Sequence, residues 1–220
     1  MKMEKTNFEQ MAEKSRELFL AHCRYSIAGK YDTDFDDEYL YISFFREQYR
    51  IGRNTGTVEA HTESNGNTGI SEKVTDNGWT PAGPGETMIF YDLFCYGEDF
   101  AKASDSFVNH ASLVHQLSAT ANPGKDMYWH YVRRFEGHVN ELKSACEKMG
   151  GVPCGKGDAA YELPVFDFMN CRFEFWEADE DFPASIVLFM DANILKFMHF
   201  ETTWYLSECI LTRITRAAGL

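Results

Sequence analysis

The sequence predicts an α+β fold, in which a single domain holds a mostly antiparallel sheet packed against several helices. Apolar residues recur at helical spacing in four segments of the chain. Elsewhere, short segments rich in β-branched and aromatic residues alternate between polar and apolar positions and end in turn residues, as strands do. No Pro- or Ser-rich linker divides the 220 residues, which favours one domain.

Four helices are expected, each for its own reason. Residues 6–28 begin with a capping box, Thr6 to Glu9, and end before Gly29. Residues 86–97 are apolar almost all round, so this helix should be buried. Residues 126–149 carry a long apolar stripe, and Gly150 is expected to end that helix. Residues 201–217 carry a second apolar stripe and form the last expected helix.

The strands are expected in two groups. Residues 39–51 are rich in strand formers, with Leu40, Ile42 and Phe44 on one face, and a turn leads to a short strand at 57–60. A hairpin is expected from a strand at 171–177 and an apolar, interior strand at 185–190. Residues 61–78 are interpreted as a loop, and residues 151–164 as a loop with a helical turn at 158–163.

Charge and composition exclude several classes of function. The net charge of −13 and the pI near 4.9 argue against binding to nucleic acid or to an anionic membrane, because both need positive surface. No apolar run is long enough for a transmembrane helix, and the charged N-terminus lacks the core of a signal peptide, so a cytoplasmic location is expected. The six cysteines show no Cys-x-x-Cys spacing and are expected to be free, mostly buried thiols.

Two sites, one at Asp92 and one at His199 and Glu201, could carry acid–base or binding chemistry. Asp92 lies within the apolar 86–97 helix, where a carboxylate must be paired, hydrogen-bonded or protonated. It is either a functional group or one satisfied by a neighbouring element. His199 and Glu201 would share a side of an extended chain and could pass a proton or bind a metal. Alternatively, Glu201 only favours a helix N-terminus, and His199 is a surface residue.

Two further segments have weaker signals. The four acidic residues within 177–181 could hold a hard cation, but their spacing does not match an EF-hand, and a solvated turn is favoured. The Gly-containing segment 79–85 precedes a helix but matches no phosphate-binding motif, which favours a structured lid or turn.

Several segments together resemble a family known as domain of unknown function 3786. The most specific are 157–168, 175–185, 188–191 and 199–201, with 86–93 and 135–151 upstream, so the resemblance covers about residues 36–220. The resemblance implies a cytoplasmic protein of anaerobic bacteria or archaea. Some relatives carry an added cysteine segment of iron–sulfur type, which this sequence lacks, so no cluster is inferred. The family offers no catalytic residues to transfer.

Three hypotheses follow from these residues. The first is a small-molecule or cofactor-binding protein of anaerobic metabolism, with a pocket between the buried helix and the sheet. The second is an enzyme that uses Asp92, Glu201 or His199 as acid or base, with or without a metal. The third is an acidic subunit that binds a basic partner. The candidate ligand-binding residues are Trp79, Tyr91, Asp92, Arg172, Trp176, His199 and Glu201. No cofactor, metal or oligomeric state is specified by the pattern.

Overall fold

The computed structural model describes residues 7–23, 30–61, 78–117 and 128–220. It confirms the α+β class, with antiparallel strands and helices in both of its compact units. The first unit comprises residues 1–101 and 195–206, and the second comprises residues 102–194 and 207–220. The expectation of a single domain stays a prediction.

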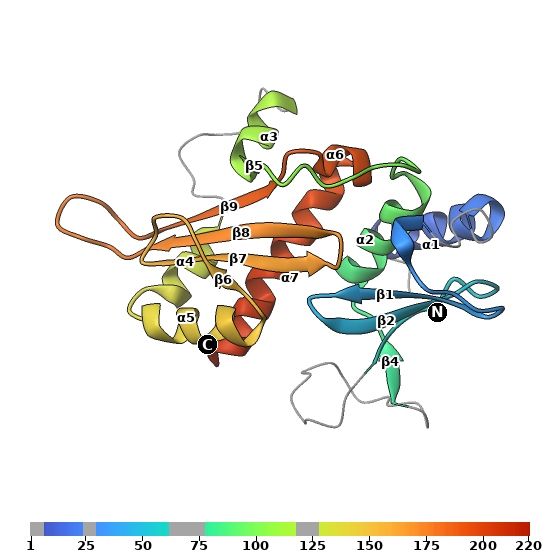
Figure 1. Cartoon of the computed structure of the whole chain (residues 1–220), viewed down its shortest axis with the longest axis horizontal. Helices are drawn as coiled ribbons and strands as arrows, with labels where there is room; N and C mark the ends of the chain where they lie inside the picture. The colour runs from blue at the N-terminus through green and yellow to red at the C-terminus, as the bar shows by residue number, and fades with distance from the viewer. Residues whose placement is uncertain (1–6, 24–29, 62–77, 118–127) are drawn as a thin grey trace. The chain divides into compact units, whose positions relative to one another are not determined.

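The sheet of the first unit has the strand order β4-β3-β2-β1 (Figure 1). Its elements are α1 (Asn7–Leu18), a π-helix (Phe19–Cys23), a short 3₁₀ turn (Lys30–Asp32), β1 (Tyr39–Phe44), β2 (Glu47–Gly52), β3 (Val58–His61), β4 (Trp79–Pro81) and α2 (Pro84–Cys95). The expected face of the first strand is confirmed, because Leu40, Ile42 and Phe44 are all buried. The expected capping residue Thr6 lies outside the described residues, and so does most of the expected 61–78 loop.

Helix α2 is the buried helix that the sequence predicts. Six of its apolar or aromatic side chains are buried: Met88, Ile89, Phe90, Tyr91, Leu93 and Phe94. The Phe90 ring packs on the sheet, with its centroid 5.4 Å from that of Phe44 and 5.0 Å from that of Tyr49. The Glu86 carboxylate accepts hydrogen bonds from the Tyr49 hydroxyl and the Gly83 N–H, which fixes the start of the helix against β2.

The second unit has the strand order β7-β8-β9-β5, with β6 paired to β7. Its elements are β5 (Phe107–Asn109), α3 (His110–Leu117), α4 (Trp129–Phe135), α5 (Val139–Lys148), β6 (Val152–Pro153), β7 (Ala159–Phe166), β8 (Met169–Trp176) and β9 (Ser185–Asp191). Helix α6 (Ile194–Phe197) spans the boundary of the units, and α7 (Phe200–Ala218) starts in the first and ends in the second. Figure 1 shows α4 and α5 on one face of the β7–β9 strands. Phe135 packs edge-on against Phe173 and Phe175 there.

Three expected elements are wrong in detail. Residues 39–51 form two strands, because Phe45 and Arg46 both take positive φ angles and turn the chain into a hairpin. The helix at 126–149 is two helices, separated at Gly137 with φ 81°. The helical turn expected at 158–163 is part of strand β7, whose pairing with β8 decides its conformation.

Further expectations concern the hairpin, the cysteines and the membrane. The 171–177 and 185–190 strands are confirmed as β8 and β9, and β9 lies between two strands. The five cysteines whose state the structure describes form no disulfide, and of these Cys146 and Cys171 are buried. Within the described ranges, no helix has the length and apolar character needed to cross a bilayer.

Candidate functional sites

The structure distributes the seven candidate residues over both units. Five of them belong to the first unit: Trp79, Tyr91, Asp92, His199 and Glu201. Arg172 and Trp176 lie on β8 of the second unit. The grouping of all seven around one pocket stays a prediction, and the contacts within each unit are described separately.

Asp92 and His199 are brought together although 107 positions separate them. The Asp92 carboxylate accepts a hydrogen bond from the His199 backbone N–H at 2.6 Å and lies 2.5 Å from its Nδ1. Asp92 is only 12% exposed, whereas the His199 side chain is 53% exposed. Tyr96, directly after α2, covers one face of the imidazole, with 3.5 Å between the ring centroids. Asp92 therefore caps the start of α7 and also orients an accessible imidazole.

The other candidates of the first unit have mainly structural contacts. The buried Tyr91 hydroxyl donates to the Gly56 carbonyl, and burial raises the pKa of Tyr91 to about 12, so this phenol stays protonated at neutral pH. The Trp79 ring lies 4.3 Å from the guanidinium of Arg50, which itself pairs with Glu59. Glu201 is exposed in the first turn of α7, where its charge favours the helix terminus.

In the second unit, Arg172 belongs to a polar network on the half-exposed face of the sheet. Its Nε donates to Glu162 at 3.0 Å, and the same carboxylate accepts a hydrogen bond from Asn170 at 2.8 Å. The Arg172 guanidinium also lies 4.1 Å from the centre of the Phe107 ring. Trp176 is 39% exposed at the far end of the same strand.

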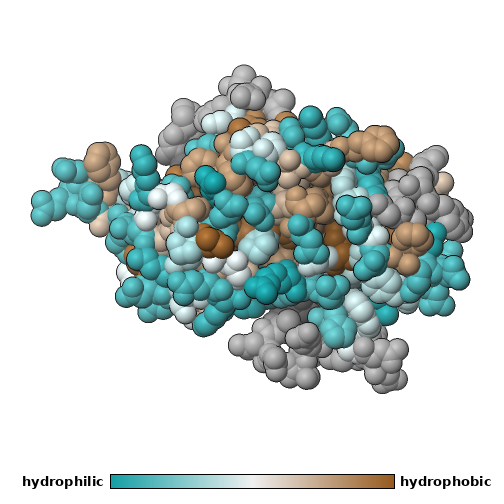
Figure 2. Space-filling model, in the orientation of Figure 1, coloured by the Kyte–Doolittle hydropathy of each residue, from teal (hydrophilic) through white to brown (hydrophobic). Residues whose placement is uncertain are grey.

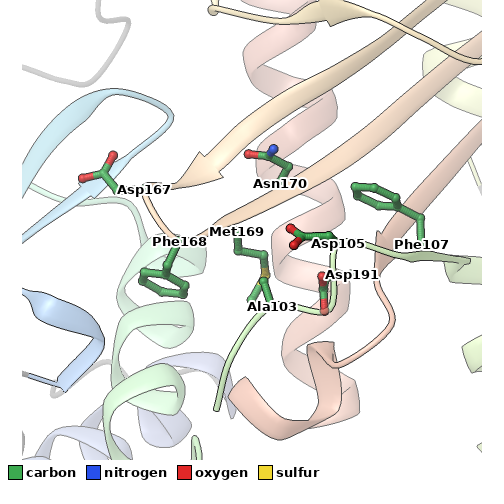
Figure 3. A pocket seen from close by; sticks show the side chains of 8 residues that line it. All are labelled: Ala103, Asp105, Phe107, Asp167, Phe168, Met169, Asn170 and Asp191. Carbon is green, nitrogen blue, oxygen red and sulfur yellow. The ribbon is translucent and has the colours of Figure 1, made fainter. Parts of the chain in front are cut away.

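A pocket of about 160 Å³ lies at the end of this sheet where β8 begins and β9 ends. Its lining residues are Ala103, Asp105, Phe107, Asp167, Phe168, Met169, Asn170 and Asp191 (Figure 3). In Figure 3, Asp105 and Asp191 lie close together on one side, and Asp167 lies on the other. Two lining residues, Phe107 and Asn170, also belong to the Arg172 network. Arg172 is thus not a lining residue itself but is the sequence candidate that contacts one, Phe107.

Asp191 is the most buried polar group of the pocket, at 2% exposure. Its carboxylate accepts hydrogen bonds from the Ser104 N–H at 2.8 Å and the Asn193 N–H at 2.7 Å, and the Ser104 hydroxyl lies 3.2 Å from both carboxylate oxygens. These bonds fix the 102–106 segment beside the end of β9. They also stabilise a negative charge at the pocket wall without any cationic side chain in the lining.

Sequence reasoning missed this pocket. Its residues come from the 103–107 segment, the β7–β8 turn and the end of β9, and strand pairing and the Ser104–Asp191 hydrogen bonds bring them together. The available signals were an aspartate directly after an apolar strand and the Asp167–Phe168 turn. The 177–181 hairpin tip, by contrast, has a hydrophilic surface at the left of Figure 2, as expected for a solvated turn. In the described part of the chain, no three His, Cys, Asp or Glu side chains are grouped so that they could hold a metal ion.

Comparison with known proteins gives one match. A family model described as "Domain of unknown function (DUF3786)" matches residues 25–213. No curated protein and no solved structure matches the chain.

Proposed function

Since the chain belongs to the DUF3786 family, whose description names no activity, we propose from its geometry that it binds a small molecule in the pocket of the second unit. We extend the proposal to a cytoplasmic role in the metabolism of an anaerobe, which the resemblance implies. The observation that carries the proposal is a buried, hydrogen-bonded carboxylate, Asp191, in the wall of a pocket that also has aromatic walls.

The size of the pocket limits the ligand. An engineered cavity of about 150 Å³ in another protein holds benzene, which has six non-hydrogen atoms. A pocket of about 160 Å³ therefore suits a metabolite fragment of similar size rather than a nucleotide or a flavin. A larger ligand would have to extend out of the pocket.

The chemistry of the lining favours a ligand that donates hydrogen bonds. Asp105, Asp167 and Asp191 provide only acceptors when ionised, and Asn170 provides both kinds of group. Phe107 and Phe168 offer aromatic faces, and Phe168 is stacked in parallel on Phe166 with 5.1 Å between centroids. A neutral polyol or an amine fits these groups, whereas a carboxylate or phosphate would be repelled.

Native mass spectrometry of the purified protein should reveal any bound metabolite directly. Three probes then test the charge preference: butane-1,4-diamine, butane-1,4-diol and butanedioate. In ¹H–¹⁵N NMR titrations, we expect the diamine or the diol to shift the amide signals of Ala103, Phe168 and Asn170, and butanedioate to leave them unchanged.

Two variants complete the test. Ala103→Phe should fill the pocket and abolish these shifts, and Asp167→Asn should weaken binding of the diamine. Asp181→Asn makes the same chemical change at the exposed hairpin tip and should have no effect. If no copurifying compound and no probe affects the pocket signals, or if Ala103→Phe leaves binding intact, the proposed function is wrong.

A further inference from the structure

The Asp92–His199 pair lies outside the proposed binding pocket and has a chemistry of its own. The carboxylate of Asp92 can only accept a hydrogen bond when ionised, so the contact at 2.5 Å places the proton on His199 Nδ1. The neutral imidazole then carries its free electron pair on Nε2. A carboxylate that holds the ring in this tautomer also stabilises the imidazolium formed when Nε2 takes a proton.

The Nε2 edge of the ring lies opposite the edge that Asp92 holds. Asp92 engages Nδ1 and Tyr96 lies against one face, which leaves the other face and the Nε2 edge to account for the 53% exposure of the His199 side chain. Within the described part of the chain, the imidazole has one hydrogen-bond partner, Asp92, and one aromatic ring partner, Tyr96, and no hydroxyl or thiol is hydrogen-bonded to it. The arrangement has a base and a positioning carboxylate, and the attacking nucleophile that fits it is water.

The surroundings restrict the substrate. Tyr96 is 46% exposed and offers a flat aromatic surface directly against the imidazole. Two acidic residues, Glu98 and Asp99, follow Tyr96 in the chain and are exposed, and Glu201 is exposed on the first turn of α7. Two basic residues are also near. The Lys30 ammonium lies 3.6 Å from the Asp99 carboxylate. Lys196 is exposed, and its backbone carbonyl accepts a hydrogen bond from the Glu98 N–H. The excess of acidic groups disfavours an anionic substrate.

We propose that His199 and Asp92 form a hydrolytic site for small uncharged esters that carry a flat, aromatic group. His199 Nε2 removes a proton from water while the water oxygen attacks the ester carbonyl. The tetrahedral intermediate collapses as the C–O bond to the leaving group breaks, and the imidazolium returns its proton to the leaving oxygen. An acid and an alcohol or phenol are the products, and no other reactant is needed.

Hydrolysis of p-nitrophenyl acetate by the full-length protein tests this proposal. General-base catalysis contributes roughly 10²- to 10⁴-fold, so His199→Gln should lower kcat/KM at least 100-fold. His138→Gln is the matched control, because His138 is 43% exposed and lies 3.9 Å from Glu141, and it should leave the rate within twofold. The anionic p-nitrophenyl phosphate should not be cleaved.

Asp92 is a positioning residue, and its test needs a readout that a purely structural role would not change. In Asp92→Asn, the side-chain amide oxygen can still accept the backbone N–H, but its NH₂ group favours the tautomer with the proton on Nε2. We expect ¹⁵N shifts to report this change of tautomer and kcat/KM to fall at least 10-fold while the urea midpoint stays close to that of the wild type.

Three outcomes would overturn the proposal. The first is an esterase rate in His199→Gln above half that of the wild type. The second is a wild-type His199 that carries its proton on Nε2. The third is a pre-steady-state burst of p-nitrophenolate, which would make the imidazole itself the nucleophile. Neither His199 nor Asp92 is a lining residue of the pocket in the second unit, so the esterase assay and the NMR titrations of the pocket can fail independently, and failure of this proposal can be told apart from failure of the proposed binding function.

Discussion

The buried histidine at the start of α3 should make the stability of the protein strongly dependent on pH. His110 is fully buried, and its Nδ1 lies 2.6 Å from the Tyr128 hydroxyl. Burial lowers the pKa of His110 from 6.5 to about 4, because the charged imidazolium loses its hydration in the interior. The neutral form is therefore the one that fits the folded state.

The sign and size of the effect follow from linkage. A pKa that is lower in the folded state means that the unfolded chain binds the proton more tightly, so protonation favours unfolding. The contribution of the neutral His110 to the free energy of unfolding is fully present above pH 6.5 and is lost as the pH falls toward 4. A depression from 6.5 to about 4 corresponds to roughly 3 kcal/mol in total, of which about 2.5 kcal/mol should be lost by pH 4.5.

Urea unfolding of the wild type and of His110→Asn at several pH values between 7.5 and 4.5 measures this contribution. Carboxylates also titrate in this range, but they do so in both proteins and largely cancel in the difference. The free energy of unfolding of the wild type relative to the variant should fall by about 2.5 kcal/mol across the range. A difference that stays constant within about 0.5 kcal/mol would refute the reasoning, as would an NMR titration of His110 with a pKa near 6.5.

Two other predictions concern a buried amine and the thiols. Lys30→Met should lower the free energy of unfolding in urea by about 2 kcal/mol, because the Lys30 ammonium donates to the carbonyls of Phe94 and Gly97 at the end of α2. The control Lys196→Met replaces an exposed lysine and should change the free energy of unfolding little. In native protein at pH 8, iodoacetamide should modify the half-exposed Cys154 before the fully buried Cys171, because burial raises the pKa of the Cys171 thiol far more strongly. Equal labelling of the two thiols by mass spectrometry would contradict this order.

The sequence predicted elements well where side-chain periodicity alone determines them. Helix α2 and the β8–β9 hairpin were predicted because burial and alternation leave a direct pattern. The β1–β2 turn was missed because its two residues with positive φ are Phe45 and Arg46, whereas a turn of this kind is usually recognised in a sequence by glycine or asparagine. The bulky pair is held in this turn by its strands and by the Phe44–Phe45 contact, at 4.7 Å between ring centroids.

Strand β7 shows why a local pattern can mislead. Residues 157–163 contain Gly, Asp and two alanines, which favour a turn or helix when considered alone. In the fold, this segment pairs with β8 from Ala159 to Phe166 and buries Tyr161 and Leu163. Its strand conformation is imposed by a partner, and tertiary pairing outweighs the weaker intrinsic propensity. The same holds for the pocket, whose lining depends on where three separate segments end.

The candidate acid–base residues were identified singly, but their pairing was not. The sequence indicated that Asp92, on an apolar helix, needs a hydrogen-bond partner. His199 was considered only together with Glu201. Periodicity says nothing about a contact across 107 positions, so only the fold could select His199 as the partner of Asp92. Tyr96 was not a candidate, although its place directly after α2 and its exposure make it part of the same cluster.

The structural and chemical roles of Asp92 can be separated because they use different hydrogen bonds. The bond from the His199 backbone N–H caps α7 and survives any substitution at position 199 other than proline. The contact with Nδ1 exists only with histidine there. A purely structural Asp92 would therefore make His199→Gln nearly neutral in stability and in every chemical assay. If Asp92 also orients a base, the same variant should keep its stability and lose its chemistry, so His199 rather than Asp92 is the position at which the two roles are distinguished.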